Sequence, residues 1–553
     1  MTLEYSLIAL LSPLFGGIMA AFLGKSFGKN FVNLVTIIGV SISFVLSCII
    51  ALEILETSAV INQNIYTWLN IGDQSFHIGL LIDNLTASMM VVVTFVSLMV
   101  HVYTIGYMHD DPGYHRFFSY ISLFTFSMLS LVMSNNFLQL FFGWEAVGVM
   151  SYLLIGFWYT KESAIKANLK AFIVNRVGDL SLILGIGIIF SITGSLDYYA
   201  VFSNSQEIAQ TELLLTSTLT VSALTAACIL LFGGAMGKSA QMPLHVWLPD
   251  SMEGPTPISA LIHAATMVTA GVFLLARMSP LFELSTTALS FVLIIGATTA
   301  LFTGILGLIQ NDIKRVVAYS TLSQLGYMVA AAGVSAYSAS LFHLMTHAFF
   351  KALLFLAAGS VIVALHHEQD IRKMGGLKNK LPITYVTSLI GSLALIGFPG
   401  FSGFFSKDAL IEAIGHADII GSGFAYASVL IGVFITALYT FRLFFKVFHG
   451  ALDEHHHDVK ESPLSITLPL VLLAIPSVII AWPTVGPMVF GSYFTTAISQ
   501  PDAYQIFGYE FTSAYGFLIH AFSSPVIYIA LFGVATAYVL YIQKPGILHD
   551  ETY

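Results

Sequence analysis

Long apolar segments separated by short polar ones recur along the whole chain. Each is about 20 residues long, enough for a helix to cross the hydrocarbon core of a bilayer. The first, from about Tyr5 to Leu23, is too long for the apolar core of a signal peptide, and no basic residue precedes it. The pattern predicts an all-α polytopic membrane protein with about fifteen transmembrane helices.

The expected spans leave short loops between them, and their boundaries are accurate to a few residues. In chain order they cover residues 5–24, 31–53, 83–106, 117–134, 136–158, 167–193, 213–250, 254–277, 285–309, 316–333, 336–365, 382–417, 420–446, 462–490 and 515–541. One loop, from Glu56 to Asp83, alternates apolar and polar residues around Ile65 to Trp68, a pattern typical of a short external hairpin.

Basic residues in the loops indicate the orientation. Counting every second loop as cytoplasmic places these on one side: Lys25, Lys29, Arg116, Lys161, Lys166, Lys170, Lys314, Arg315, Arg372, Lys373, Lys378, Lys380, Lys446, Lys460 and Lys544. Only Arg277 falls on the other side, where the loops carry acids such as Asp197 and Glu510. By the positive-inside rule the N-terminus lies outside and the C-terminus inside.

Composition narrows the function classes. Apolar residues make up 57% of the chain and charged residues 9%, against roughly 25% charged residues in a soluble domain. The net charge of -9 provides no basic field for nucleic acid. Cys48 and Cys228 are the only cysteines and both lie in apolar runs, which excludes a disulfide framework and a cysteine-based metal or iron-sulfur site. Any redox chemistry must therefore belong to another chain.

A few charges fall inside the expected spans. The basic ones are Arg176, Lys238, Lys351 and Lys407, and the acids at similar depth are Glu145, Asp179 and Asp408. A cation at mid-membrane costs about 3 kcal/mol on insertion scales and over 10 in simulations, so it faces protein or water and usually has a partner. Burial lowers the pKa of a lysine and a nearby carboxylate raises it again, so a lysine with a movable acid partner can take up and release a proton. The charges favour proton translocation over the alternative, static ion pairs that hold helices together.

Two of these lysines lie beside helix breakers. Lys238 follows a glycine-rich run and precedes Pro243, while Lys407 follows Pro399 and Gly400. Proline and glycine weaken a helix, and broken helices at membrane depth are typical of ion sites, although glycines also serve simple close packing. The two lysines are 169 residues apart, and so are Arg116 and the span that begins near residue 285. This spacing predicts two five-helix repeats, inverted relative to each other because five is odd, with broken helices around Pro243 and Pro399.

Histidines accompany the third lysine. His343, His347 and Lys351 are four residues apart, which places them on one stripe of a helix. Histidine titrates near neutral pH, so the stripe favours a proton relay, to which His263 on the eighth expected span adds another polar point. A metal site is disfavoured because no HExxH arrangement is present. The tract His455 to His457 looks like a metal ligand set, but its place in a loop favours a solvated connector.

Together these motifs closely resemble the antiporter-like subunit L family of respiratory complex I over nearly the whole chain. The matching stretches are GWEAVGVMSYLLIGFWY from Gly143, KAFIVNRVGDL from Lys170, GKSAQMPLHVWLPDSMEGPTPISALIHAATMVTAGV from Gly237, DIKRVVAYSTLSQLGYM from Asp312, FHLMTHAFFKALLFLAAGSVI from Phe342, HHEQDIRKMGG from His366 and FFSKD from Phe404.

The resemblance implies a proton path along a central hydrophilic axis. In the family's terms Glu145 pairs with Lys238, and Arg176 and Asp179 lie nearby. His263, His343, His347 and Lys351 then bridge to Lys407 and Asp408. The resemblance also implies that NADH, FMN, iron-sulfur clusters and quinone belong to partner subunits, with no cofactor or metal on this chain, and that a neighbouring antiporter-like subunit is a partner.

The expected organisation is N-terminal helices with the external hairpin over residues 1–115, the first repeat over 116–280, the second over 281–450, and C-terminal helices over 451–553. Family members continue with a long lateral helix beside their neighbours. This chain stops at Tyr553, soon after its last expected span, so we expect that helix to be absent.

The sequence therefore predicts a proton-translocating subunit of a bacterial NADH:quinone oxidoreductase, in the inner membrane, that couples quinone reduction to proton transport. Two alternatives stay open. One is a subunit of a cation/proton antiporter or of an inorganic-carbon uptake complex, which uses the same core without NADH oxidation. The other is a structural spacer that closes the membrane arm without conducting protons.

Overall fold

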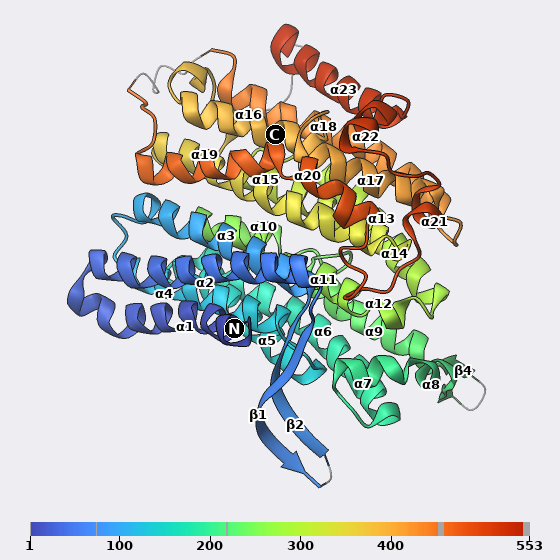
Figure 1. Ribbon diagram of the computed structural model, residues 1–553. Helices are drawn as coiled ribbons and strands as arrows, with labels where there is room; N and C mark the ends of the chain where they lie inside the picture. Colours follow the sequence, from blue (N-terminus) through green and yellow to red (C-terminus); the bar gives the residue numbers. More distant parts are fainter. Residues whose placement is uncertain (1, 73, 217–218, 452–457, 546–553) are drawn as a thin grey trace.

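The computed structural model describes residues 2–72, 74–216, 219–451 and 458–545. The first part consists of long helices and one hairpin: α1 (Thr2–Phe27), α2 (Lys29–Thr57), β1 (Ile61–Ile71), β2 (Gln74–Ile82) and α3 (Asn84–Tyr107). The antiparallel pairing of β1 with β2 confirms the hairpin predicted between Glu56 and Asp83. It lies at the end of the molecule opposite the turn that joins α1 to α2 (Figure 1).

The middle of the chain alternates long helices with short, broken ones. Its first half comprises α4 (Tyr114–Val132), α5 (Phe137–Ile155), α6 (Glu162–Thr193), α7 (Tyr198–Ser203), α8 (Ser205–Gln210), β3 (Glu212–Thr216), β4 (Leu219–Ser222), α9 (Ala223–Lys238), α10 (Thr256–Ala264) and α11 (Ala270–Arg277). Its second half comprises α12 (Ser279–Phe282), α13 (Thr286–Leu308), α14 (Ile313–Gly333), α15 (Tyr337–Ala364), α16 (Pro382–Ile396), α17 (Ser402–His416) and α18 (Ser422–Phe448).

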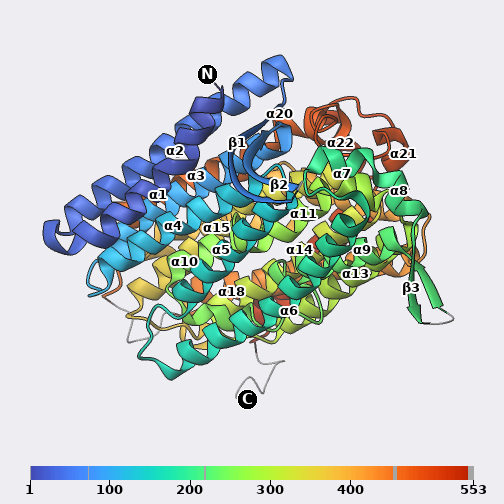
Figure 2. The ribbon, with the colours of Figure 1, turned by 90° about the horizontal axis from the view of Figure 1, so that it is seen from below.

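The last part is shorter helices: α19 (Leu464–Ile479), α20 (Ala481–Val485), α21 (Ala503–Phe507), α22 (Ala514–Ala521) and α23 (Pro525–Tyr538). The predicted His455 to His457 connector lies outside the described residues. The expected all-α fold needs one correction, because β3 and β4 form a second small antiparallel pair that projects beside α8 (Figure 2).

The protein is a mostly helical membrane protein. Within the described residues, ten helices are long and apolar enough to span a bilayer, or up to eleven if the pair Leu464–Ile479 and Ala481–Phe490, bent by 42°, counts as one span. The remaining expected spans correspond to helices that are broken, short or rich in polar residues: α4, α9, α14, and α16 with α17. Two of the breaks are the predicted ones, since α9 stops at Lys238 before Pro243, and α16 and α17 flank Pro399.

Helix α15 is the centre of the bundle. It packs against α3, α10, α11, α14, α16, α17 and α19, and in Figure 1 it runs between the blue α1–α4 and the orange α16 and α19. Its residues from Tyr337 to Ile362 are buried without interruption. Polar side chains on this helix are therefore shielded from both lipid and solvent.

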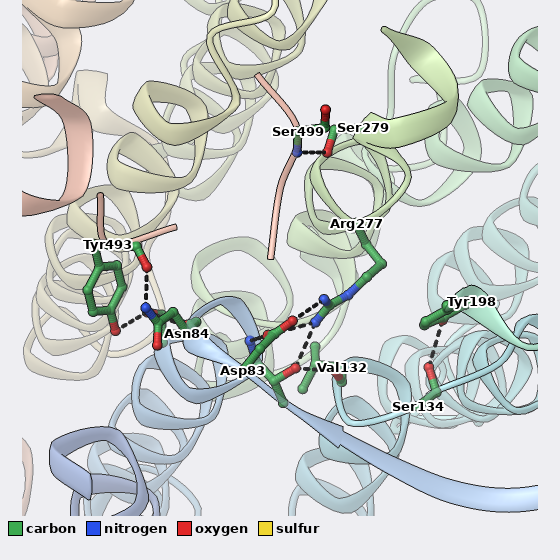
Figure 3. A network of polar contacts seen from close by, with 11 residues as sticks. Asp83, Asn84, Val132, Ser134, Tyr198, Arg277, Ser279, Tyr493 and Ser499 are labelled. Carbon is green, nitrogen blue, oxygen red and sulfur yellow. Dashed lines mark hydrogen bonds and ion pairs between the residues drawn. The ribbon is translucent and has the colours of Figure 1, made fainter. Parts of the chain in front are cut away.

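Two basic residues assigned to loops are in fact buried. The side chain of Arg277 is 2% exposed and forms a two-pronged ion pair with Asp83, at 2.5 and 3.0 Å (Figure 3). Lys314 is 2% exposed and donates to the carbonyls of Met252 and Gly254. Both residues lie at helix ends, Arg277 at the end of α11 and Lys314 at the start of α14. Hydropathy alone cannot distinguish an exposed charge at a helix end from one that neighbouring segments cover.

Candidate functional site

A chain of charges crosses α5, α6 and α9. Arg176 on α6 forms an ion pair with Glu145 on α5 and lies 3.6 Å from Asp179. The Nζ of Lys238, at the end of α9, lies 3.5 Å from Oδ1 of Asp179. The order of contacts is thus Glu145, Arg176, Asp179, Lys238. This differs from the direct pairing of Glu145 with Lys238 that the resemblance implied, because Arg176 occupies the position beside Glu145.

Close helix packing brings Asp179 to Lys238. A Cβ on Gly178 of α6 would lie 3.0 Å from the Cα of Gly237 on α9, so the two backbones touch at this point. Asp179 and Lys238 each follow one of these glycines. The glycines therefore serve close packing and also bring the two charged side chains together, because the same contact between α6 and α9 does both.

The ammonium group of Lys238 also lies against α5. A Cβ on Gly148 would sit 2.9 Å from its Nζ, and Gly148 follows Glu145 by one helical turn on the same face. Trp144 completes the surroundings, since its Nε1 donates to Asp179 Oδ1 at 2.9 Å. Lys238 is thus placed between the carboxylate of Asp179 and the helix that carries Glu145.

A second polar cluster lies on α15 and its neighbours. His343, His347 and Lys351 are all 0% exposed, as the predicted stripe requires of a buried relay. Lys351 donates to the hydroxyl of Ser320, and its Nζ lies 3.4 Å from the Val317 carbonyl. Both ring nitrogens of His347 are buried and make no hydrogen bond with any other described residue.

Both ring nitrogens of His343 make hydrogen bonds. Its Nε2 lies 3.0 Å from the side-chain oxygen of Gln324, and its Nδ1 lies 2.8 Å from the hydroxyl oxygen of Ser406. Ser406 directly precedes Lys407 on α17 and also contacts Thr346, at 2.7 Å. The histidine stripe is therefore linked to the segment that carries Lys407.

Lys407 and Asp408 are both buried, and within the described residues neither charged group makes a hydrogen bond. Lys407 is 1% exposed, and its Nζ makes no hydrogen bond among the described residues but faces the Tyr327 ring at 5.2 Å. Asp408 is 2% exposed, and neither of its carboxylate oxygens has a partner in that same set. Unpaired buried charges are costly, which is typical of functional positions rather than of packing.

His263 lies beside the second cluster. Its Nε2 is 3.3 Å from the Ser251 hydroxyl, and its ring packs on Phe355, one turn beyond Lys351 on α15. Within the described residues, no ion pair or hydrogen bond connects Lys238 to His263. The structure thus shows two polar clusters with His263 close to the second.

The described residues contain no group of three or more His, Cys, Asp or Glu side chains that could hold a metal ion. Side chains of these types instead lie beside lysines in the two polar clusters, as Asp179 does beside Lys238. Such an arrangement suits the transfer of protons between neighbouring groups.

Comparisons with known proteins identify the family. Residues 134–438 match the family model described as "NADH:quinone oxidoreductase/Mrp antiporter, TM", and residues 68–118 match "NADH-Ubiquinone oxidoreductase (complex I), chain 5 N-terminus". NADH-quinone oxidoreductase subunit L of Neisseria meningitidis serogroup A is 57% identical over 98% of this chain and 84% of its own length. The chain belongs to the NADH-quinone oxidoreductase subunit L family.

The chain is also similar to proteins named NADH-ubiquinone oxidoreductase chain 5. NADH-ubiquinone oxidoreductase chain 5 of Marchantia polymorpha is 49% identical over 86% of this chain and 72% of its own length. Two solved structures share the fold. A chain of the Mrp complex from Dietzia sp. matches with a TM-score of 0.75 at 22% identity, over 98% of this chain and 56% of that one. A chain of an archaeal membrane-bound sulfane sulfur reductase matches with a TM-score of 0.76 at 24% identity, over 89% and 78%.

Sequence reasoning missed four polar partners in this member of the subunit L family: Trp144, Ser320, Gln324 and Ser406. Gln324 carried a signal, because a glutamine inside an expected membrane span needs hydrogen-bond partners as much as a charge does. The two serines carried none, since a serine in a membrane helix commonly bonds to its own backbone.

Proposed function

We propose that this antiporter-like subunit of the NADH-quinone oxidoreductase membrane arm translocates protons through the two polar clusters. The path would begin at Glu145, Arg176, Asp179 and Lys238. It would pass His263 to Lys351, His347 and His343, and end at Lys407 and Asp408. The observation that carries this proposal is the hydrogen-bonded link from His343 through Ser406 to the segment of Lys407.

The chain would work as two inverted five-helix units, over residues 116–280 and 281–450. Each unit would contribute a lysine beside a broken helix, Lys238 before Pro243 and Lys407 after Pro399. A lysine placed where the helix is interrupted can reach groups on both sides of the break. Residues 1–115 and 451–553 would flank the two units.

A neighbouring subunit would cover the face formed by α5 and α6. The side chains of Arg176 and Glu145 are 38% and 22% exposed on this face, near the middle of membrane-spanning helices. Apolar side chains surround them, including Phe142 and Val177. Because lipid cannot solvate an ion pair, a polar surface of another antiporter-like subunit fits this position better than the bilayer.

NADH, FMN, iron-sulfur clusters and quinone would belong to other subunits of the complex, and energy would reach this chain through them. The membrane would be the bacterial inner membrane, with the N-terminus outside. A peripheral arm with flavin and iron-sulfur absorbance that co-purifies with the chain supports this assignment. A complex without that arm would instead indicate a cation/proton antiporter, the activity suggested by the shared fold with the Mrp complex.

Replacing Lys238 with alanine tests the first cluster. We expect proton pumping per NADH oxidised to fall at least severalfold in proteoliposomes, because Asp179 loses the lysine with which it would exchange a proton. A general acid or base typically contributes about 10²-fold or more to the rate of a proton-transfer step. Glu145→Gln should lower pumping as well. If both variants assemble and pump at the wild-type rate, the proposed roles are wrong.

Gly148→Ala tests the position of Lys238 without removing a charge. The added Cβ meets the flexible end of the lysine at 2.9 Å, so we expect assembly to be unchanged while pumping falls, because the ammonium is displaced from α5. Gly187→Ala on α6 is the matched control, since a Cβ there meets nothing within 4 Å. Equal pumping rates in both variants would show that this contact has no role.

A further inference from the structure

Helix α17 carries a row of titratable side chains that leads from the core to the surface. Asp408, Glu412 and His416 follow one another at four-residue intervals, which places them along one side of the helix. Burial decreases along the row: Asp408 is buried, Glu412 is intermediate and His416 is exposed. The row begins at the carboxylate that has no partner and ends at the loop between α17 and α18.

The C-terminal segment meets this row at Glu412. The hydroxyl of Tyr509 donates to Glu412 Oε2 at 2.6 Å, and Nδ1 of His520 on α22 lies 3.4 Å from Oε1. The rings of Tyr509 and His520 stack at a centroid distance of 4.8 Å. The Glu412 side chain is 14% exposed and that of His520 is 50% exposed. A carboxylate in the protein interior is thus connected to a histidine that reaches solvent.

Tyr509 also lies at the protein surface. It lines a surface pocket of about 450 Å³ together with Tyr504 and Glu510. This end of α17 lies beside α21, at the same end of the molecule as the hairpin of β1 and β2 (Figure 1). By the loop charges, this is the outer end.

We propose that Glu412 is the residue through which protons leave the buried pair Lys407 and Asp408, with His520 as the acceptor next to solvent. The inference rests on the proposed function, because it requires Lys407 to deliver protons. The two oxygens of Asp408 are buried, unpartnered and one helical turn from Glu412. Tyr509 is a positioning residue, which holds one oxygen of Glu412 and leaves the other directed to His520.

Each step moves one proton between named groups. The ammonium of Lys407 gives a proton to the carboxylate of Asp408; neighbouring helix positions diverge by about 100°, so this step requires a bridging water. Asp408 then passes the proton to the carboxylate of Glu412, again through a water, because its oxygens make no hydrogen bond with any described residue. Glu412 passes it to the imidazole of His520. The imidazolium releases it to solvent. At the end Lys407 is neutral, and both carboxylates and His520 have returned to their initial states.

The test compares Glu412→Gln and Glu412→Asp in the assembled complex in proteoliposomes. Glutamine keeps the shape and the bond from Tyr509 but cannot carry the proton, so we expect the initial rate of pumping to fall about tenfold or more. Aspartate can carry it and should retain most of the rate. Glu510→Gln, which removes an exposed acid beside Tyr509, should leave the rate unchanged.

Two results would overturn the inference: a wild-type rate in Glu412→Gln, or equal losses in the glutamine and aspartate variants, which would indicate a structural role. Lys407→Ala separates this inference from the proposed function. If Lys407→Ala stops pumping while Glu412→Gln does not, protons leave by another route and the central path stands. If Lys407→Ala also pumps normally, the path itself is wrong.

Discussion

We expect Lys351→Met to slow proton transport through this chain about a hundredfold while the complex still assembles. Methionine fills a similar volume in the buried centre of α15 but cannot hold a proton, so the proposed relay from His263 to His347 would lose its connecting group. A cation without a partner at mid-membrane costs about 3 kcal/mol or more, and each 1.4 kcal/mol or so is a tenfold change in rate. We therefore expect about a hundredfold slower passage, measured as pumping per NADH oxidised in proteoliposomes.

Lys351→Arg distinguishes a relay from a structural cation. Arginine keeps the charge and the capacity to donate to Ser320, but it does not release its proton at physiological pH. A relay therefore fails in this variant too, whereas a purely structural cation is replaced by it. Lys166→Ala, which removes an exposed lysine paired with Glu162, is the control and should pump normally. Normal pumping in Lys351→Met would remove the α15 stripe from the mechanism.

The α15 stripe was predictable because it depends only on local geometry. His343, His347 and Lys351 share a face of any helix that contains them, and the apolar sequence around them places that helix in the core. The broken helices were predictable for a similar reason, because Pro243, Pro399 and the adjacent glycines restrict the backbone wherever they occur. Both features follow from residues close together in the chain.

The partners of these residues were not predictable, because they depend on how distant segments pack. Ser406 lies 63 residues from His343, and no feature of its own sequence distinguishes it from other serines in the spans. The choice of Arg176 rather than Lys238 as the partner of Glu145 depends on differences of a few ångströms between two cations that the sequence places near the same acid. Such choices require coordinates.

The number of spans illustrates the same limit. Hydropathy treated residues 213–250 and 382–417 as single long spans, although the sequence predicted a break in each, around Pro243 and Pro399. In the structure the first contains a β-hairpin, the short helix α9 and irregular backbone, and the second contains two 15-residue helices, α16 and α17. Apolar character indicates that a segment is buried, but it does not indicate whether the segment is one helix.

Arg277→Met should prevent stable assembly of the subunit. The variant leaves the carboxylate of Asp83, 1% exposed, without its cation. Removing one partner of a buried ion pair costs about 3–5 kcal/mol, a large part of the stability of a folded domain. Asp83 also caps α3 by accepting from the backbone of Thr86, and Arg277 donates to the Thr86 hydroxyl at 2.8 Å. The start of α3 and the end of α11 are thus held together at one point.

Hydrogen bonds next to the pair of Arg277 and Asp83 attach a further segment of the chain, so loss of the pair affects more than the two helices. Asn84 donates to the carbonyl of Tyr493, and the hydroxyl of Ser279 accepts from the backbone of Ser499, so the loop after α20 is attached to the same place (Figure 3). Loss of Arg277 should therefore loosen the N-terminal hairpin, α11 and the C-terminal loop together. The measurement is the amount of assembled subunit in the membrane and the unfolding temperature of the purified complex.

The double variant Asp83→Asn with Arg277→Met separates charge from shape. Asparagine can still cap α3, and no buried charge is left unpaired, so most of the lost stability should return. Because the pair lies outside the proposed proton path, the double variant should also pump normally once assembled. Lys166→Ala, which breaks an exposed ion pair worth at most about 0.5 kcal/mol, should leave the unfolding temperature unchanged. A single Arg277→Met variant as stable as that control would show that the buried pair contributes little.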